Sequence, residues 1–93
     1  MQDKITKEKI EKYLKITEKA LKIAKEKIVK GKEAMAFEII TMVECYLSDS
    51  KHFKEKGNYV NSFACINYSH GWLDSGARLK IFNVKNTDLF TVA

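Results

Sequence analysis

The stretch KITKEKIEKYLKITEKALKIAKEKIVKG, residues 4–31, decides the fold class of this chain. Its apolar and small side chains return every three or four positions and so line one face of an α-helix. The positions on this face are Ile10, Leu14, Thr17, Leu21, Ala24 and Ile28. The stretch therefore predicts an amphipathic first helix over residues 4–30. We expect Gly31 to close it, because glycine favours the left-handed position that ends many helices.

The same spacing recurs twice more along the chain. It predicts a second helix over residues 33–56, which Gly57 ends, and a third over residues 59–82, for which Asn58 is a suitable N-cap. Short connections between long helices favour antiparallel neighbours. We therefore predict an all-α fold: a single-domain, antiparallel, up-down-up three-helix bundle over residues 1–93.

A short tail, residues 83–93, follows the predicted helices and ends in the apolar residues Leu89, Phe90 and Val92. We expect this tail either to fold back over the bundle or to stay extended, so that a partner can pair with it.

The predicted third helix is apolar on more than one side and contains two glycines, Gly71 and Gly76. Glycine inside a helix costs roughly 0.5–1 kcal/mol relative to alanine. We therefore expect both glycines to allow a close backbone approach, and Trp72 to pack in the core. On this basis the third helix is predicted to be the most deeply packed of the three.

The composition is that of an ordinary globular domain, with 45% hydrophobic and 31% charged residues. No apolar run approaches the roughly 18–20 residues of a membrane span, and the first residues lack the apolar core of an export signal. We therefore expect a cytoplasmic protein that does not enter the membrane. No phosphate-binding loop, dinucleotide fingerprint or metalloprotease motif is present, so no cofactor is predicted.

The two cysteines, Cys45 and Cys65, form no Cys-x-x-Cys pair and are expected to be buried free thiols. In an antiparallel pair that turns near Gly57, Cys65 lies level with residue 50. That is about 7 Å along the axis from Cys45, so a disulfide between them is not expected.

The formal charge of +5 lies entirely on residues 1–33, which hold eleven Lys and six Asp or Glu residues. A Lys-rich helix can bind nucleic acid. However, this segment has no arginine, and each of four glutamates precedes a lysine by four positions, which favours intrahelical pairs. These pairs are Glu8–Lys12, Glu11–Lys15, Glu18–Lys22 and Glu26–Lys30. We expect a solvated face, with weak nucleic-acid binding as an alternative.

A polar stripe is the strongest candidate site. Asn67, Asp74 and Arg78 fall on one line of the third helix, and His70 lies one turn before Asp74. One interpretation is structural, with Asp74 bonded to Arg78 or to a neighbouring helix, because a buried charge needs a partner. The other is a small-ligand or catalytic site walled by Trp72 or Tyr68. Cys45 lies roughly level with His70, but no metal-ligand motif supports a metal site there.

The segment GNYVNSFACINYSHGWLDSGARLKIF, residues 57–82, resembles a family of small archaeal proteins, Domain of Unknown Function 357. The resemblance rests on Gly57-Asn58, Phe63-Ala64, Tyr68, Gly71-Trp72-Leu73-Asp74, Gly76 and Leu79. It implies a closed up-and-down three-helix bundle and carries no activity, substrate or catalytic residue. Ser75 and Lys80 depart from the pattern, in which the resemblance implies Ala and Gly.

The function that these observations favour is a non-enzymatic protein-interaction or scaffold domain that can also self-associate. No catalytic residue is assigned. The alternatives are a small-ligand or catalytic site around Asp74 and His70, and nucleic-acid binding through the first helix.

Overall fold

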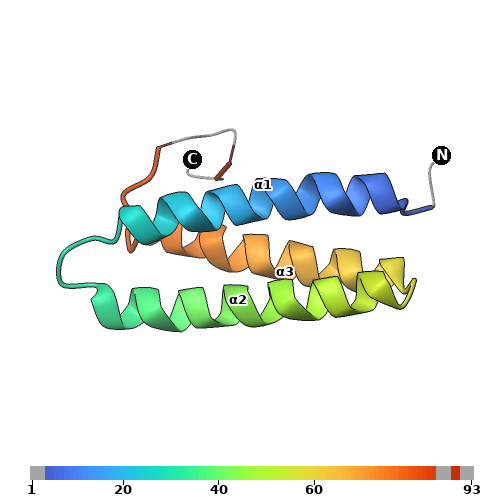
Figure 1. Cartoon of the computed structure of the whole chain (residues 1–93). Coiled ribbons are helices and arrows are strands. Elements are labelled where there is room, and N and C mark those ends of the chain that lie inside the picture. The colour runs from blue at the N-terminus through green and yellow to red at the C-terminus, as the bar shows by residue number, and fades with distance from the viewer. Residues whose placement is uncertain (1–3, 86–88, 91–93) are drawn as a thin grey trace.

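The computed structural model describes residues 4–85 and 89–90 and contains three α-helices. They are α1 (Lys7–Glu26), α2 (Glu33–Glu55) and α3 (Tyr59–Arg78). The helices run up, down and up, with short connections at the two ends (Figure 1). The predicted all-α three-helix bundle is confirmed. The closest helices are α2 and α3, and α1 packs mainly on α3.

Helix α1 is shorter than predicted at both ends. It begins after Thr6, whose hydroxyl accepts a hydrogen bond from the Lys9 amide at 3.1 Å. It ends at Glu26, four residues before the predicted end, so Gly31 does not close it. Gly31 instead has a φ of +93° in a tight turn, in which the Lys32 amide donates to the carbonyl of Val29 at 2.9 Å.

The early end of α1 has a physical cause in the chain that follows α3. The Val29 amide donates to the Ile81 carbonyl at 2.9 Å, and the Asn83 amide donates to the Lys27 carbonyl at 2.7 Å. These bonds form an antiparallel bridge between Ile28 and Phe82. β-Branched residues such as Ile28 and Val29 favour extended backbone, so this bridge competes successfully with a further helical turn.

Helix α3 also ends four residues before its predicted end, at Arg78. The Lys80 amide donates to Ala77 and the Ile81 amide to Gly76, which is the bond pattern of a Schellman cap. Lys80 occupies the left-handed position of this cap, with a φ of +60°. Gly57 occupies the equivalent position after α2, with a φ of +76°, as its place in the sequence predicts.

Buried serines join α2 to α3. The Ser50 hydroxyl lies 2.9 Å from the Ser62 carbonyl oxygen, and the Ser62 hydroxyl lies 2.7 Å from the Ser50 carbonyl oxygen. About two turns further along α3, the Ser69 hydroxyl donates to the carbonyl of Val43 at 3.1 Å. Because serine is small and each hydroxyl has a backbone partner, the two helices can approach closely without a buried polar group left unbonded.

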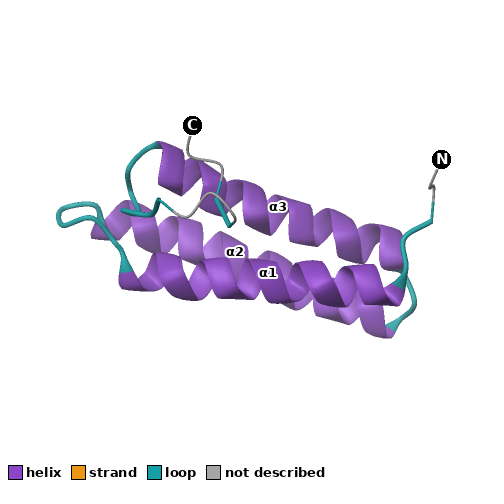
Figure 2. Ribbon diagram, turned by 90° about the horizontal axis from the view of Figure 1, so that it is seen from above, coloured by secondary structure: helices purple, strands orange, loops and turns teal. Residues whose placement is uncertain are grey.

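The core combines the apolar faces of the helices with the tail. Ile10, Val43, Ile66 and Leu73 are buried, and so are Phe82, Leu89 and Phe90 from the segment after α3. The described part of the tail therefore folds back over the bundle, beside α3 (Figure 2). Val92, which the sequence grouped with this cluster, lies outside the described residues.

Candidate functional site

His70 is the best-connected member of the predicted polar stripe. Its Nε2 lies 2.7 Å from the Leu89 carbonyl oxygen, and its Nδ1 lies 3.2 Å from the Thr17 hydroxyl. A carbonyl oxygen only accepts, so Nε2 carries a hydrogen and donates to it. In the neutral ring Nδ1 then accepts from Thr17. Both ring nitrogens are therefore used to join α3 to α1 and to the tail.

Asp74 lies one turn along α3 from His70, and the two side chains are half-buried. Its Oδ1 is 3.7 Å from His70 Nε2, which is beyond hydrogen-bond length but close enough for an electrostatic contact. The predicted proximity of His70 and Asp74 is therefore present. Because His70 Nε2 points at Leu89 at the shorter distance, the arrangement resembles a structural clamp on the tail more than an acid–base pair open to substrate.

The other two stripe residues, Asn67 and Arg78, differ in their position relative to this clamp. Asn67 is exposed and lies at the edge between two shallow hollows on α3. Arg78 is exposed at the far end of α3, where it lines a different hollow with Lys27 and Lys80. The structure therefore brings Asn67, His70 and Asp74 to one hollow, whereas Arg78 lines another.

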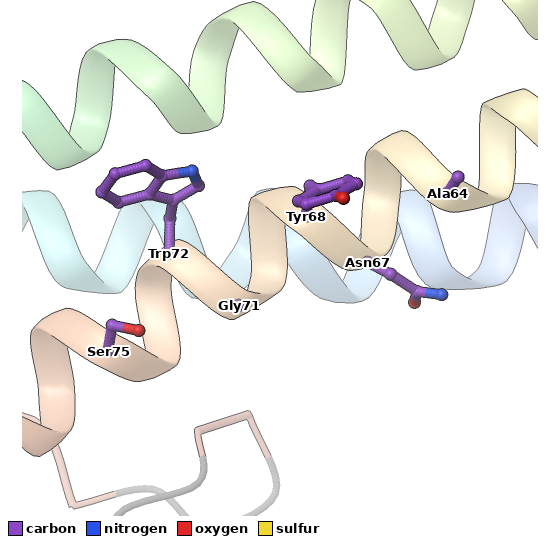
Figure 3. Close-up of a pocket in the computed structure, with 6 residues that line it drawn as sticks. All are labelled: Ala64, Asn67, Tyr68, Gly71, Trp72 and Ser75. Carbon is purple, nitrogen blue, oxygen red and sulfur yellow. The ribbon is translucent and has the colours of Figure 1, made fainter.

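The aromatic residues proposed as walls of that site lie on a different face of α3. Tyr68 and Trp72 point toward the α2 side and line a hollow to which His70 does not contribute (Figure 3). The Tyr68 ring stacks on the Tyr46 ring of α2, with centroids 5.3 Å apart. The expectation that Trp72 packs in the core is wrong, because the residue is 38% exposed.

An exposed apolar strip runs along α3 and is the most distinctive surface of the molecule. Its members follow one another at intervals of three or four residues, with Trp72 beside Gly71. We call this set the α3 strip: Val60, Ala64, Tyr68, Gly71, Trp72, Ser75 and Leu79. Val60 and Leu79 are each 68% exposed and Tyr68 is 63% exposed. At the centre of the strip the surface forms a shallow hollow (Figure 3).

Helix α3 packs against the other two helices more extensively than α1 or α2 does, as predicted, although the α3 strip leaves one side of it exposed. One of its faces packs on α2 and α1, but the opposite face leaves large apolar side chains in solvent. The sequence signal was correct in showing an apolar surface on more than one side, and incomplete because periodicity alone does not say which sides are covered.

Gly71 has no packing role inside this chain. A Cβ built at Gly71 would meet no atom within 4 Å in the described part of the chain, apart from its immediate neighbours and its own helix backbone. The predicted close approach at this position is therefore wrong for the isolated chain. Glycine in a helix interior costs roughly 0.5–1 kcal/mol relative to alanine, and no contact among the described residues offsets that cost.

The two cysteines differ in exposure. Cys45 is exposed, contrary to the expectation of a buried thiol, and Cys65 is half-buried. Burial raises the pKa of the Cys65 thiol, and the negative charge of Asp49 adds to this effect. Across residues 4–85 and 89–90, no group of three His, Cys, Asp or Glu side chains is arranged to hold a metal ion.

Two charged residues of α1 pair with residues of α2. Lys25 pairs with Glu44 of α2 at 2.8 Å, and Glu18 pairs with Lys51 of α2 at 2.9 Å. Glu18 therefore does not pair with Lys22 as its spacing predicts.

Helix α1 contributes no membrane span, and neither does any other described helix, since none is both long and apolar enough.

Comparison with known proteins gives one match. The model of the family DUF357, described as a protein of unknown function, matches residues 12–82, which is more than half of the chain. Neither the curated proteins nor the solved structures gave a match.

Proposed function

Because this chain belongs to the DUF357 family, for which no activity is described, we propose its function from its own surface: a non-enzymatic protein-interaction domain that uses the α3 strip. The observation that carries the proposal is the exposure of Val60, Tyr68 and Leu79 in one line. Single exposed apolar residues are normal, but a continuous apolar surface marks a site of protein contact. Tyrosine and tryptophan are also the residue types most enriched at the centres of such contacts.

Two features of the strip favour a protein as the ligand. Its seven members include no charged residue, so a partner need not neutralise a charge in order to bury the strip. The central hollow is shallow and lined mostly by apolar atoms, which suits a side chain or a helix of a partner better than a small polar molecule.

The alternative site at His70 draws less support. A general base or a ligand-binding imidazole needs a free ring nitrogen, and here one nitrogen contacts Thr17 while the other contacts Leu89. Nucleic-acid binding through α1 also draws less support, since Lys25 is paired with Glu44 and the helix lacks arginine. We place the proposed interaction in the cytoplasm, where two free thiols stay reduced.

Site-specific photocrosslinking tests the proposal. A benzophenone side chain replaces Tyr68 in the α3 strip and, as a matched control, Phe37 on α2, which is similarly exposed but lies outside the strip. The experiment uses the full chain in the cells that produce it. We expect adducts of defined mass from position 68 and none from position 37. Adducts from both positions, or from neither, would count against an interaction through this strip.

A further inference from the structure

We infer that the α3 strip is the interface of a symmetric dimer, in which α3 of a second copy of this chain crosses it in the antiparallel direction at Gly71. This inference rests on the proposed function and names the partner. Three observations carry it: the arrangement of side-chain sizes along the strip, the place of Gly71, and the distribution of charge.

The order of sizes along the strip is self-complementary. A twofold axis requires that, if one residue of the first copy contacts a second residue of the other, the reverse contact also forms. Two antiparallel copies of α3 centred between Tyr68 and Gly71 meet this condition with matching sizes. The facing positions are Val60 with Leu79, Ala64 with Ser75, and Tyr68 with Gly71.

Each facing pair has a physical reason to be where it is. At the centre, the Tyr68 ring lies over the space that Gly71 leaves empty, which lets the helix axes approach. Ala64 and Ser75 are small and keep that approach close on both sides of the crossing. Val60 and Leu79 are large and fill the wider space near the ends, where the two helices diverge.

Gly71 gains a role in this arrangement that it lacks in the single chain. No atom within 4 Å restricts a side chain there, so the monomer would accept a better helix former. A second helix backbone at this point would not, because a side chain would hold the two axes apart. A solvent-exposed glycine in the middle of a helix is accounted for when the helix is one half of a close crossing.

Charge permits a second copy at this surface, and area sets its affinity. The excess of positive charge lies on residues 1–33, whereas residues 34–93 hold equal numbers of basic and acidic residues. The α3 strip lies on one helix that is about 30 Å long and about 10 Å wide, so it offers roughly 300 Å². A stable specific interface buries about 800 Å² per partner, so we expect a weak dimer that forms toward millimolar concentration.

The first test is the mass of the purified full chain by sedimentation equilibrium, from low micromolar to millimolar concentration. We expect a monomer–dimer equilibrium. Tyr68→Ala should weaken it about tenfold or more, because it removes the central aromatic contact. Phe37→Ala removes a similarly exposed aromatic ring outside the strip and should leave it unchanged. Equal weakening by both variants, or a monomer at every concentration, would overturn the inference.

The Gly71→Leu variant separates loss of the dimer from loss of the monomer fold. Leucine is a strong helix former, and in the described part of the chain a Cβ at this position meets no atom within 4 Å beyond its neighbours and its own helix backbone, so the monomer should stay folded. The dimer should be lost, because the new side chain occupies the crossing point. Retention of the dimer by a folded Gly71→Leu variant would also overturn the inference.

Disulfide trapping tests the direction of the helices in a background where Cys45 and Cys65 are replaced by serine. Ala64→Cys and Ser75→Cys should cross-link rapidly when the two variants are mixed, and each alone should not. In the antiparallel register, two copies of position 64 are about 16 Å apart along the axis. Rapid cross-linking of Ala64→Cys with itself would show a parallel pair and would refute the proposed arrangement.

These outcomes separate the two proposals. If the chain is monomeric throughout but the photocrosslinks from position 68 trap a different protein, the dimer is refuted and the interaction domain stands. If neither method detects a contact through the strip, both proposals fail.

Discussion

The ring of Phe82 occupies the space into which a side chain at Gly76 would point. A Cβ built at Gly76 would lie 2.6 Å from Cδ2 of Phe82 and 3.2 Å from Cδ1 of Ile39. Phe82 is almost completely buried, and its backbone forms the bridge to Ile28. The glycine therefore lets the segment after α3 fold directly back onto the helix it has just left. This contact explains why the bundle closes at that end with so short a turn.

We predict that Gly76→Ala destabilises the fold by about 1–3 kcal/mol, because the added methyl group overpacks a site between two buried side chains. Thermal unfolding of the purified chain measures this loss. In a Phe82→Leu background the same substitution should cost less, since residues in contact are not additive. Equal costs in the two backgrounds would show that the ring of Phe82 is not what restricts position 76.

Gly71→Ala is the matched substitution in the same helix, and we predict the opposite sign for it. No contact opposes the new methyl group, so the gain in helix propensity should stabilise the monomer by about 0.5–1 kcal/mol. Unfolding is measured at the lowest practical concentration, so that the monomer is observed. A loss of stability comparable to that of Gly76→Ala would contradict the open environment of Gly71.

Lys80 gives a prediction about backbone strain. It adopts a φ of +60° in the cap of α3, a conformation that costs an L-residue about 1–2 kcal/mol and costs glycine nothing. We expect Lys80→Gly to raise stability by about 0.5–1 kcal/mol after the greater freedom of glycine in the unfolded chain is deducted. In a domain of this size that corresponds to a few degrees in Tm. Lys80→Ala removes the same charge and keeps the strain, so it should leave Tm nearly unchanged.

The Cys65 thiol should differ from a small thiol in solution in the pH at which it reacts. Burial and the nearby Asp49 raise the pKa of Cys65 above its ordinary value of 9.0, whereas Cys45 is exposed. Only the thiolate reacts, so alkylation of Cys65 should require a higher pH than alkylation of a small thiol in solution. Mass spectrometry of the iodoacetamide-treated Cys45→Ser variant gives the Cys65 profile. Asp49→Asn should move the Cys65 profile to lower pH.

The same pKa difference has a consequence for stability. The folded chain holds the Cys65 proton more tightly than the unfolded chain, so this contribution is fully present below pH 9.0 and is lost as the pH rises through the folded pKa. Wild-type protein should therefore lose stability at alkaline pH more steeply than Cys65→Ser. The reverse order of the two slopes would show that the pKa of Cys65 is lowered by folding.

The three-helix fold could be predicted from local spacing, because each helix buries one continuous face. Ile10, Leu14 and Leu21 lie on the predicted face of α1 and are buried. The helix ends were less predictable. Ile28 continues the apolar pattern of α1, but it leaves the helix to pair with Phe82, which is fifty-four residues further along the chain. Long-range backbone pairing of this kind leaves no local signal in the sequence.

The surface was predictable only in part, for a similar reason. Periodicity identifies the apolar positions of α3 but does not say which of them another helix covers. It placed Trp72 in the core, and it gave the same reason for Gly71 as for Gly76 although their surroundings differ. The buried Ser62 and Ser69 also carried no sequence signal, because serine is more common on surfaces. Their role depends on how closely α2 and α3 approach.

The contact between His70 and Thr17 provides the last prediction. Thr17 is buried in α1, and its hydroxyl is 3.2 Å from His70 Nδ1. His70→Leu removes this bond and the bond to the Leu89 carbonyl, and leaves a buried hydroxyl without its partner. We expect a loss of about 1–3 kcal/mol in the free energy of unfolding, together with increased exposure of the tail to proteases.

A double-mutant cycle distinguishes this clamp from a ligand site. Thr17→Val keeps the shape of the side chain and removes its hydroxyl. If the two residues are coupled through their hydrogen bond, Thr17→Val combined with His70→Leu should cost less than the two single variants added together, by about 0.5 kcal/mol or more. A functional residue is often a source of strain, and its removal then stabilises the protein. An increase in stability on His70→Leu would therefore refute the clamp and restore the interpretation of His70 and Asp74 as a binding site.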